Sequence, residues 1–74
     1  MMRELDMVTL ARDLPEQGLQ AGDLGCVVMI HAGGRGCEVE FATVRGVTVA
    51  VVTLGFDDVR PVTGNEIPHA RSVA

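Results

Sequence analysis

The feature that most constrains this chain is a set of short apolar runs separated by glycine, with no stretch of helical periodicity. Nine of its 74 residues are glycine, and most of them lie between runs rich in β-branched residues. In the segment 37–41 (Cys-Glu-Val-Glu-Phe), apolar and acidic residues alternate, which places the apolar side chains on one face of a strand. This pattern predicts an all-β domain of short strands and tight turns.

Five strands, one long loop and one helical turn account for the pattern. The strands are expected at residues 5–10, 25–31, 37–41, 47–54 and 59–62. In the long loop, residues 11–24, we expect Leu14 and Leu19 to turn toward the core, and a short helix can form over residues 15–19. A single helical turn at 55–58 precedes the last strand. This order is the connectivity of a small five-stranded SH3-like barrel, in which closure hides strand edges that would otherwise aggregate.

The chain has room for one domain and a tail. Residues 1–62 contain every strand segment, so we expect a single SH3-like barrel domain there. Residues 63–74 lack any pattern and are expected to form a flexible C-terminal tail. A chain this short buries about 60% of the surface that its unfolded form exposes. Its stability is therefore expected to be modest and to gain from oligomerisation or from a bound partner.

Charge and aromatic content argue against nucleic acid and membranes as partners. The formal net charge is −4, and the six basic residues are arginines that are scattered singly. Binding to a phosphate backbone needs several convergent cations, and stacking of bases needs aromatic side chains, of which there are two. The N-terminus is acidic where a signal peptide needs an apolar stretch, and the longest apolar run, 47–52, is too short to cross a bilayer. We therefore expect a cytoplasmic protein with reduced cysteines.

The first third of the chain carries a distinctive spaced motif. It reads Val8-x-Leu10, then Asp13-Leu14-Pro15-Glu16-x-Gly18-Leu19-x-x-Gly22-Asp23-x-Gly25-x-Val27-Val28. This motif resembles that of a family of small bacterial domains of unknown function with an SH3-like barrel fold. Residues 38–41, 52–54 and 59–62 fit the same family, so the likeness covers roughly residues 5–62. The resemblance implies a bacterial protein, sometimes encoded near mobile elements or toxin partners, and it transfers no catalytic activity.

The residues that could bind a soft metal are few: Cys26, His31, Cys37 and His69. Zinc sites usually contain closely spaced pairs such as C-x-x-C, whereas these two cysteines are 11 residues apart. If the hairpin folds about residue 34, His31 pairs with Cys37 and Cys26 lies opposite Ala42. Two ligands would then converge, and the two thiols would be too far apart for a disulfide. We therefore expect no metal and no cofactor, and buried reduced thiols.

Cys37 beside His31 is the arrangement that offers catalytic chemistry. A cysteine nucleophile needs a base that lowers its pKa, and His31 could supply it in this register. No oxyanion-stabilising element is recognisable, and the glycine-rich segment 33–36 is too short for a phosphate loop. We therefore expect no catalytic residues. A small enzyme or ligand-binding protein that uses Cys37 and His31 remains the alternative.

The strand expected at 47–54 departs from the pattern of a barrel strand with one exposed face. Val47, Val49 and Val51 lie on one face, and the other face is also apolar. Such a strand should alternate apolar with polar residues. The second face must therefore be covered by the long loop, by the tail with Ile67 and Val73, by a second copy or by a foreign partner. The candidate partner-binding residues are Val47, Val49, Val52, Leu54, Leu14 and Leu19.

These observations predict a non-enzymatic protein-interaction module, either a homo-oligomer or an accessory subunit of a larger assembly. Its partner would be a protein or a second copy of the chain. A more specific alternative is an antitoxin or immunity protein whose acidic surface neutralises a basic toxin. The net charge of −4 is compatible with that alternative.

Overall fold

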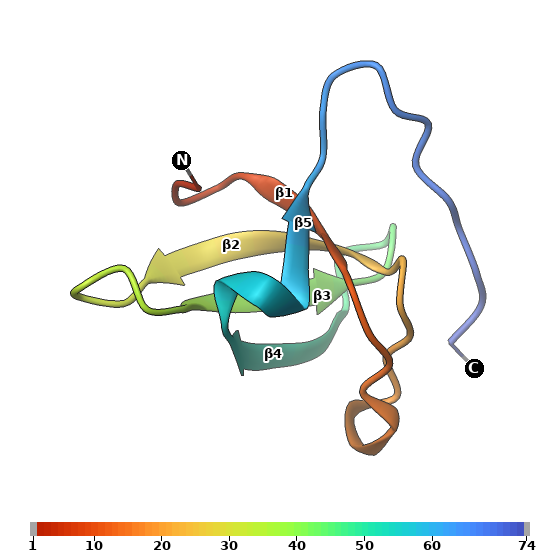
Figure 1. Ribbon diagram of the computed structural model, residues 1–74. Coiled ribbons are helices and arrows are strands. Elements are labelled where there is room, and N and C mark those ends of the chain that lie inside the picture. Colours follow the sequence, from red (N-terminus) through yellow and green to blue (C-terminus); the bar gives the residue numbers. More distant parts are fainter. Residues whose placement is uncertain (1, 74) are drawn as a thin grey trace.

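The computed structural model describes residues 2–73 and shows an all-β protein (Figure 1). These residues form five strands: β1 (Met7–Leu10), β2 (Leu24–Ile30), β3 (Cys37–Ala42), β4 (Thr48–Leu54) and β5 (Val59–Pro61). Two short 3₁₀-helices, η1 (Pro15–Gln17) and η2 (Phe56–Asp58), lie in the connections. Neither helix has the length or the hydrophobicity to cross a membrane. The predicted all-β class and the predicted order of elements are confirmed.

The strands form one antiparallel sheet in the order β4-β3-β2-β1-β5. Three consecutive strands are joined by short hairpins, and the last strand returns to lie beside the first. This is the strand order that the SH3-like connectivity predicts. The sheet is twisted, so that β5 runs across the direction of β2 and β3 in Figure 1. Within residues 2–73 no ladder joins β4 to β5, and the sheet therefore keeps two edges.

The core lies on the inner face of this sheet. In β3, Cys37, Val39 and Phe41 are buried while Glu38 and Glu40 point to the other face, as the alternation predicts. The other buried apolar residues come from every remaining strand and from the first loop: Val8, Leu10, Leu14, Leu19, Val27, Leu54 and Val59. The alternating strand therefore supplies the centre of the core, and the neighbouring elements close around it.

The first loop closes one end of the core. Leu14 and Leu19 are both buried, and each of their backbone N–H groups donates to the carbonyl oxygen of the other, at 3.0 and 3.1 Å. The helical turn η1 lies between them and begins with Pro15, whose fixed φ suits a first helical position. Gly18 ends the turn in the left-handed conformation. The predicted inward position of both leucines is confirmed.

Gly25 allows β2 to pack against the core residues of β3. A Cβ atom at this position would lie 2.6 Å from Val39 Cγ1 and 2.8 Å from Phe41 Cε1. Any other residue would therefore displace the two side chains at the centre of the core. Glycine is needed here for space, because the Phe41 ring occupies the volume that a side chain would take.

The observed β2–β3 pairing differs from the predicted one at the hairpin and again at a register shift between Val27 and Met29. A bulge adds one residue to one strand and moves every later pair. The β2–β3 hairpin pairs His31 with Gly36, so Ile30, and not His31, lies opposite Cys37. Beyond the bulge the register moves by one more residue, and Cys26 lies opposite Glu40 and not Ala42. The prediction that His31 pairs with Cys37 is therefore wrong. Cys37 is buried and Cys26 is half-buried, and within residues 2–73 both thiols are free.

The tail after β5 forms no strand or helix in residues 63–73 and runs back along the molecule toward the first loop (Figure 1). Two arginines make its main polar contacts. Arg60 of β5 binds the carboxylate of Glu66 at 2.8 and 3.0 Å. Arg71 binds the carboxylate of Asp23 at 2.6 and 2.7 Å. The predicted flexibility of this tail stays a prediction.

Candidate functional site

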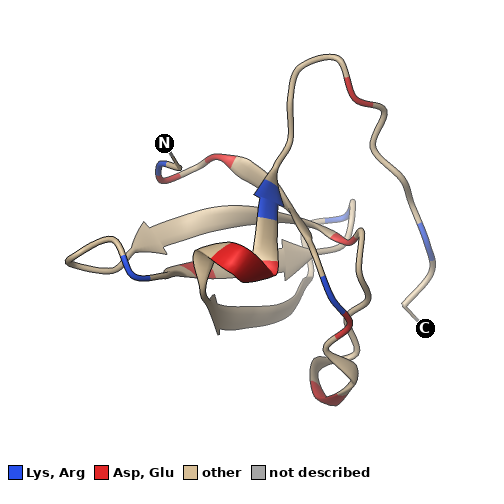
Figure 2. Ribbon diagram, in the orientation of Figure 1, with Lys and Arg blue, Asp and Glu red and all other residues tan. Residues whose placement is uncertain are grey.

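β4 forms one edge of the sheet and pairs with β3 alone in the strand order. Within residues 2–73, no backbone hydrogen bond outside the β3–β4 ladder reaches Thr48–Leu54. Backbone N–H and C=O groups along β4 therefore point away from the sheet without a partner strand. The strand sequence, Thr-Val-Ala-Val-Val-Thr-Leu, contains no charged residue and no proline, and no charged colour lies on β4 in Figure 2.

The two faces of β4 differ in burial. On the inner face Leu54 is 3% exposed, and Ala50 and Val52 are half-buried against the core. On the outer face Val51 is 54% exposed. Val47 lies just before the strand and is 62% exposed. The core therefore covers one apolar face of the strand and leaves the other uncovered.

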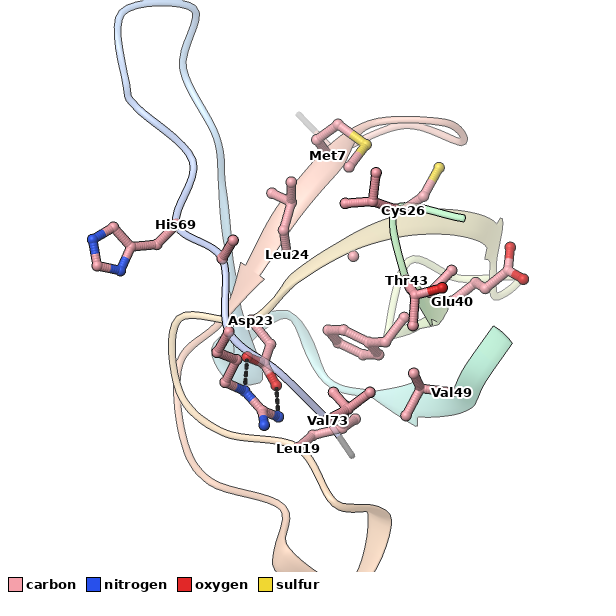
Figure 3. Close-up of a pocket in the computed structure, with 16 residues that line it drawn as sticks. Met7, Leu19, Asp23, Leu24, Cys26, Glu40, Thr43, Val49, His69 and Val73 are labelled. Carbon is pink, nitrogen blue, oxygen red and sulfur yellow. Dashed lines mark hydrogen bonds and ion pairs between the residues drawn. The ribbon is translucent and has the colours of Figure 1, made fainter. Parts of the chain in front are cut away.

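Near the start of β4 the register with β3 shifts, and Val49 therefore belongs to neither of the two regular faces of the strand. Phe41 pairs with Ala50 and Ala42 with Thr48, so Val49 is the extra residue of a bulge. Its side chain turns toward the end of the core and lies beside Val73 of the tail in Figure 3. The regular part of the edge is therefore 50–54, with Val51 as its exposed apolar residue.

The structure divides the six predicted partner-binding residues into two groups. Leu14, Leu19 and Leu54 are buried in the core, and Val52 is half-buried against it. Val47 and Val49 are exposed. The six do not include Val51, the most exposed apolar side chain within β4. The alternation of β4 could have identified it, because it shares a face with Val47 and Val49 in an unbulged strand.

Two carboxylates on the outer face of β3 are bound by hydroxyl groups of β4. Thr48 Oγ1 donates to Glu40 Oε2 at 2.5 Å, and Thr53 Oγ1 donates to Glu38 Oε2 at 2.7 Å. Thr53 lowers the pKa of Glu38, and the hydrogen bond from His31 Nε2, at 2.6 Å, lowers it further. These bonds hold both carboxylates on the outer face of the sheet between β3 and β4, and β4 itself contains no charged residue.

The cysteine and histidine that offered catalytic chemistry are not brought together. Cys37 is fully buried, and burial raises the pKa of its thiol, with Glu38 and Asp58 raising it further. A thiol nucleophile needs the opposite shift. His31 is hydrogen bonded to Glu38, whose side chain leaves β3 on the face opposite to Cys37. In the described part of the chain, no group of three or more His, Cys, Asp or Glu residues could hold a metal ion.

A groove of about 390 Å³ lies between the sheet and the tail (Figure 3). Its walls are mainly apolar and include Leu24, Phe41 and Val44. Residues 69–73 of the tail form its remaining side, where His69 points away from the groove and Val73 lies beside Leu19. The groove is a second candidate site, separate from the regular part of the β4 edge.

A twisted five-stranded antiparallel sheet with SH3-like strand order defines a small all-β domain. The chain belongs to the family described as "Domain of unknown function (DUF4926)", whose model matches residues 4–61. The match covers all five strands, ends with the last residue of β5 and leaves the tail outside. The predicted membership of a small family of unknown function is confirmed. No curated protein and no solved structure matches the chain.

Proposed function

We propose that this protein is a non-enzymatic protein-interaction module that assembles through the β4 edge, with a second copy of the chain as its partner. The observation that carries the proposal is the uncharged, proline-free edge with an exposed apolar residue at its centre, Val51. A strand of this kind is a template for pairing, because its outward N–H and C=O groups are met by the backbone of another strand.

A second copy suits this edge because the edge is complementary to itself. Two uncharged strands can pair antiparallel without like charges opposite each other. Glu38 and Glu40 belong to the neighbouring strand β3, and their carboxylates are bound on the outer face of the sheet by the hydroxyls of Thr53 and Thr48, so the outward N–H and C=O groups of β4 are not blocked by a charged side chain of β4 itself. Pairing of this edge with itself would be two-fold symmetric, and two-fold dimers are the commonest homo-oligomers.

The proposal assigns no catalytic role to any residue. Its support is the burial of Cys37, the raised pKa of that thiol and the pairing of His31 with Glu38. We also propose that the protein works in the bacterial cytoplasm. The free thiols of Cys26 and Cys37 suit a reducing compartment.

Neutralisation of a basic protein, in the manner of an antitoxin or immunity protein, is a second candidate function. Three ion pairs join an arginine to an acidic residue: Arg12 with Asp58, Arg60 with Glu66 and Arg71 with Asp23. Within residues 2–73, the other seven of the ten acidic residues have no arginine partner. A complex formed through these acids would weaken steeply as salt is raised, whereas apolar strand pairing would not.

The test is the mass of the protein in solution, measured by light scattering for the wild type and two lysine variants. We expect the wild type at twice the chain mass of 7.8 kDa and Val51→Lys at the mass of one chain, because an edge lysine blocks strand pairing. Val28→Lys is the matched control, since Val28 is 41% exposed on the interior strand β2. It should stay a dimer.

Circular dichroism and urea unfolding establish that both variants are folded. A wild-type protein that stays a monomer at high concentration would contradict the proposal. The same conclusion follows if the folded Val51→Lys variant remains a dimer. Hydrogen exchange gives an independent readout, because the outward amides of β4 should be protected in the wild type and exposed in Val51→Lys.

A further inference from the structure

Beside the groove, the second candidate site, the carboxylate of Asp23 and the carbonyl oxygen of Gly18 bind the guanidinium of one arginine. We call these two groups the clasp. The guanidinium of Arg71 donates from Nε to Asp23 Oδ1 at 2.7 Å and from Nη2 to Asp23 Oδ2 at 2.6 Å. Nη2 also donates to the carbonyl oxygen of Gly18 at 2.9 Å. Two parallel bonds from a planar group to one carboxylate are a geometry that arginine provides and lysine does not.

Asp23 is oriented for this role by its own loop. The backbone N–H of Gln20 donates to Asp23 Oδ2 at 2.8 Å, so one carboxylate oxygen is already fixed from the protein side. The hydrogen bond from Arg71 is the largest cause of a lowered pKa at Asp23, and the Gln20 bond adds to it. The carboxylate is therefore charged at neutral pH and aimed at the tail.

An apolar groove begins beside the clasp. Val73, two residues after Arg71, lies next to Leu19 and Val49 at the groove in Figure 3. Its own side chain nevertheless stays 50% exposed, while a cavity of about 390 Å³ remains between the walls. The tail therefore satisfies the clasp and leaves the apolar part of the site largely unfilled.

The residues of the sheet and the first loop that form the groove and the clasp, here called the receptor, lie inside the part of the chain that the family model matches, and the tail segment that occupies them lies outside it. Asp23, Gly18, Leu19 and Val49 all lie within residues 4–61, which the family model matches. Arg71 and the rest of the segment lie in the tail outside it. The receptor is thus part of the domain, whereas the present occupant is an addition to it.

We propose that this groove is a peptide-binding site that recognises an extended protein segment with an arginine followed two residues later by an aliphatic residue. The segment 71–73 of the chain is an internal ligand that occupies the site until a partner segment displaces it. The proposal goes beyond assembly through β4 and does not depend on it. Because the groove is unfilled, a partner with leucine at the second position should bind more tightly than the tail sequence itself.

The experiment measures the binding of labelled peptides to the full-length chain by fluorescence anisotropy. The probe is Ala-Arg-Ser-Leu-Ala, and the comparison peptides carry lysine in place of arginine or aspartate in place of leucine. Arg71→Ala removes the internal ligand, so it should raise the affinity for the probe about tenfold over the wild type. Arg35→Ala, which changes an arginine in the distant β2–β3 hairpin loop, is the matched control and should leave the affinity unchanged.

The receptor is tested by Asp23→Asn in the Arg71→Ala background, which should reduce probe affinity at least tenfold because the bidentate partner loses its charge. Both comparison peptides should also bind at least tenfold more weakly. Methyl chemical shifts of Leu19 and Val49 should move on addition of the probe. The proposal is overturned if folded Arg71→Ala protein does not bind the probe. It is equally overturned if Asp23→Asn or the lysine peptide leaves the affinity unchanged.

Discussion

The two edges of the sheet are built in opposite ways. β4 is seven residues long, uncharged and free of proline, and its outer face exposes Val51. β5 is three residues long and contains Arg60 and Pro61. Proline has no N–H to offer a neighbouring strand, and an edge charge opposes the close approach of another sheet. In Figure 2 the ribbon of β5 carries the colour of a basic residue, and no charged colour lies on β4.

An edge charge and an edge proline are common features that prevent sheets from pairing. This chain has both on β5 and neither on β4. Arg60 and Pro61, which we call the guard on β5, oppose pairing at that edge. The tail holds Arg60 in place, because Glu66 binds both the guanidinium of Arg60 and the hydroxyl of Thr63. A sheet with one open edge per chain can pair once, which gives a closed dimer. A sheet with two open edges can pair repeatedly and gives an open filament. The asymmetry of the edges is therefore what would limit assembly to two copies.

The largest effect is expected when the guard on β5 is removed. The double substitution Arg60→Val with Pro61→Val restores an N–H and deletes the charge, so both edges of the sheet become open. We expect the dimer to be replaced by large assemblies, seen as a steep rise in light scattering and in thioflavin T fluorescence.

Two controls keep this prediction specific. Arg60→Lys retains the charge and should stay a dimer, and the triple variant with Val51→Lys should return to small species because β4 is then blocked. If the double variant is folded and remains a dimer, the tail and not the two guard residues protects β5.

The next effect separates the two faces of β4. Leu54 is buried, so Leu54→Ala should lower the free energy of unfolding by about 2–5 kcal/mol through lost burial and a cavity. Val51→Ala, at an exposed position, should change the unfolding of the monomer by no more than about 0.5 kcal/mol. Urea unfolding at low protein concentration measures both values. A large loss of monomer stability at Val51 would mean that its side chain serves folding and not assembly.

A smaller loss of stability is expected at Gly36, where the end of β4 packs closely against the residue that precedes β3. A Cβ atom on Gly36 would lie 2.7 Å from the backbone carbonyl oxygen of Leu54, so Gly36→Ala must move one strand relative to the other. We expect a loss of about 1–3 kcal/mol in unfolding free energy, as for other overpacked sites. Gly64→Ala is the matched control, because a Cβ there meets nothing within 4 Å, and its cost should stay below about 0.5 kcal/mol. Equal costs at the two positions would contradict the close fit.

Sequence reasoning recovered the fold because the local signals agreed with each other. The alternation of residues 37–41 identified the core face of β3, and the glycine-rich segments marked the hairpins. The register was not recoverable, because the bulges near Val28 and Val49 add one residue each and leave no clear mark in an apolar run. The exact centre of the β2–β3 hairpin was equally hidden within a run of glycines, and a one-residue difference there placed Ile30, and not His31, opposite Cys37.

The candidate site was recovered in part for a similar reason. The apolar character of both faces of residues 47–54 identified the unusual strand, but pattern alone could not say which face the core covers. Leu54 therefore appeared as a possible contact residue, although it is buried. The clasp between Asp23 and Arg71 joins residues 48 positions apart, and neither belongs to a periodic segment. No local signal could have paired them.

The smallest effect concerns the pH dependence of the β5 guard. Hydrogen bonds from Arg60, and then from Thr63, lower the pKa of Glu66 from 4.5 to about 2. Because the folded-state pKa lies below the ordinary value, the stabilisation is fully present above about pH 4.5 and is lost as the pH falls toward 2. Glu66→Gln should therefore lower Tm slightly at pH 7, and its difference from the wild type should vanish near pH 2. Glu16→Gln, at an exposed residue of η1 with no ion pair within residues 2–73, should show no such trend. If the Tm difference for Glu66→Gln is the same at both pH values, the carboxylate does not hold Arg60 over the β5 edge, and the edge is guarded by Arg60 and Pro61 alone.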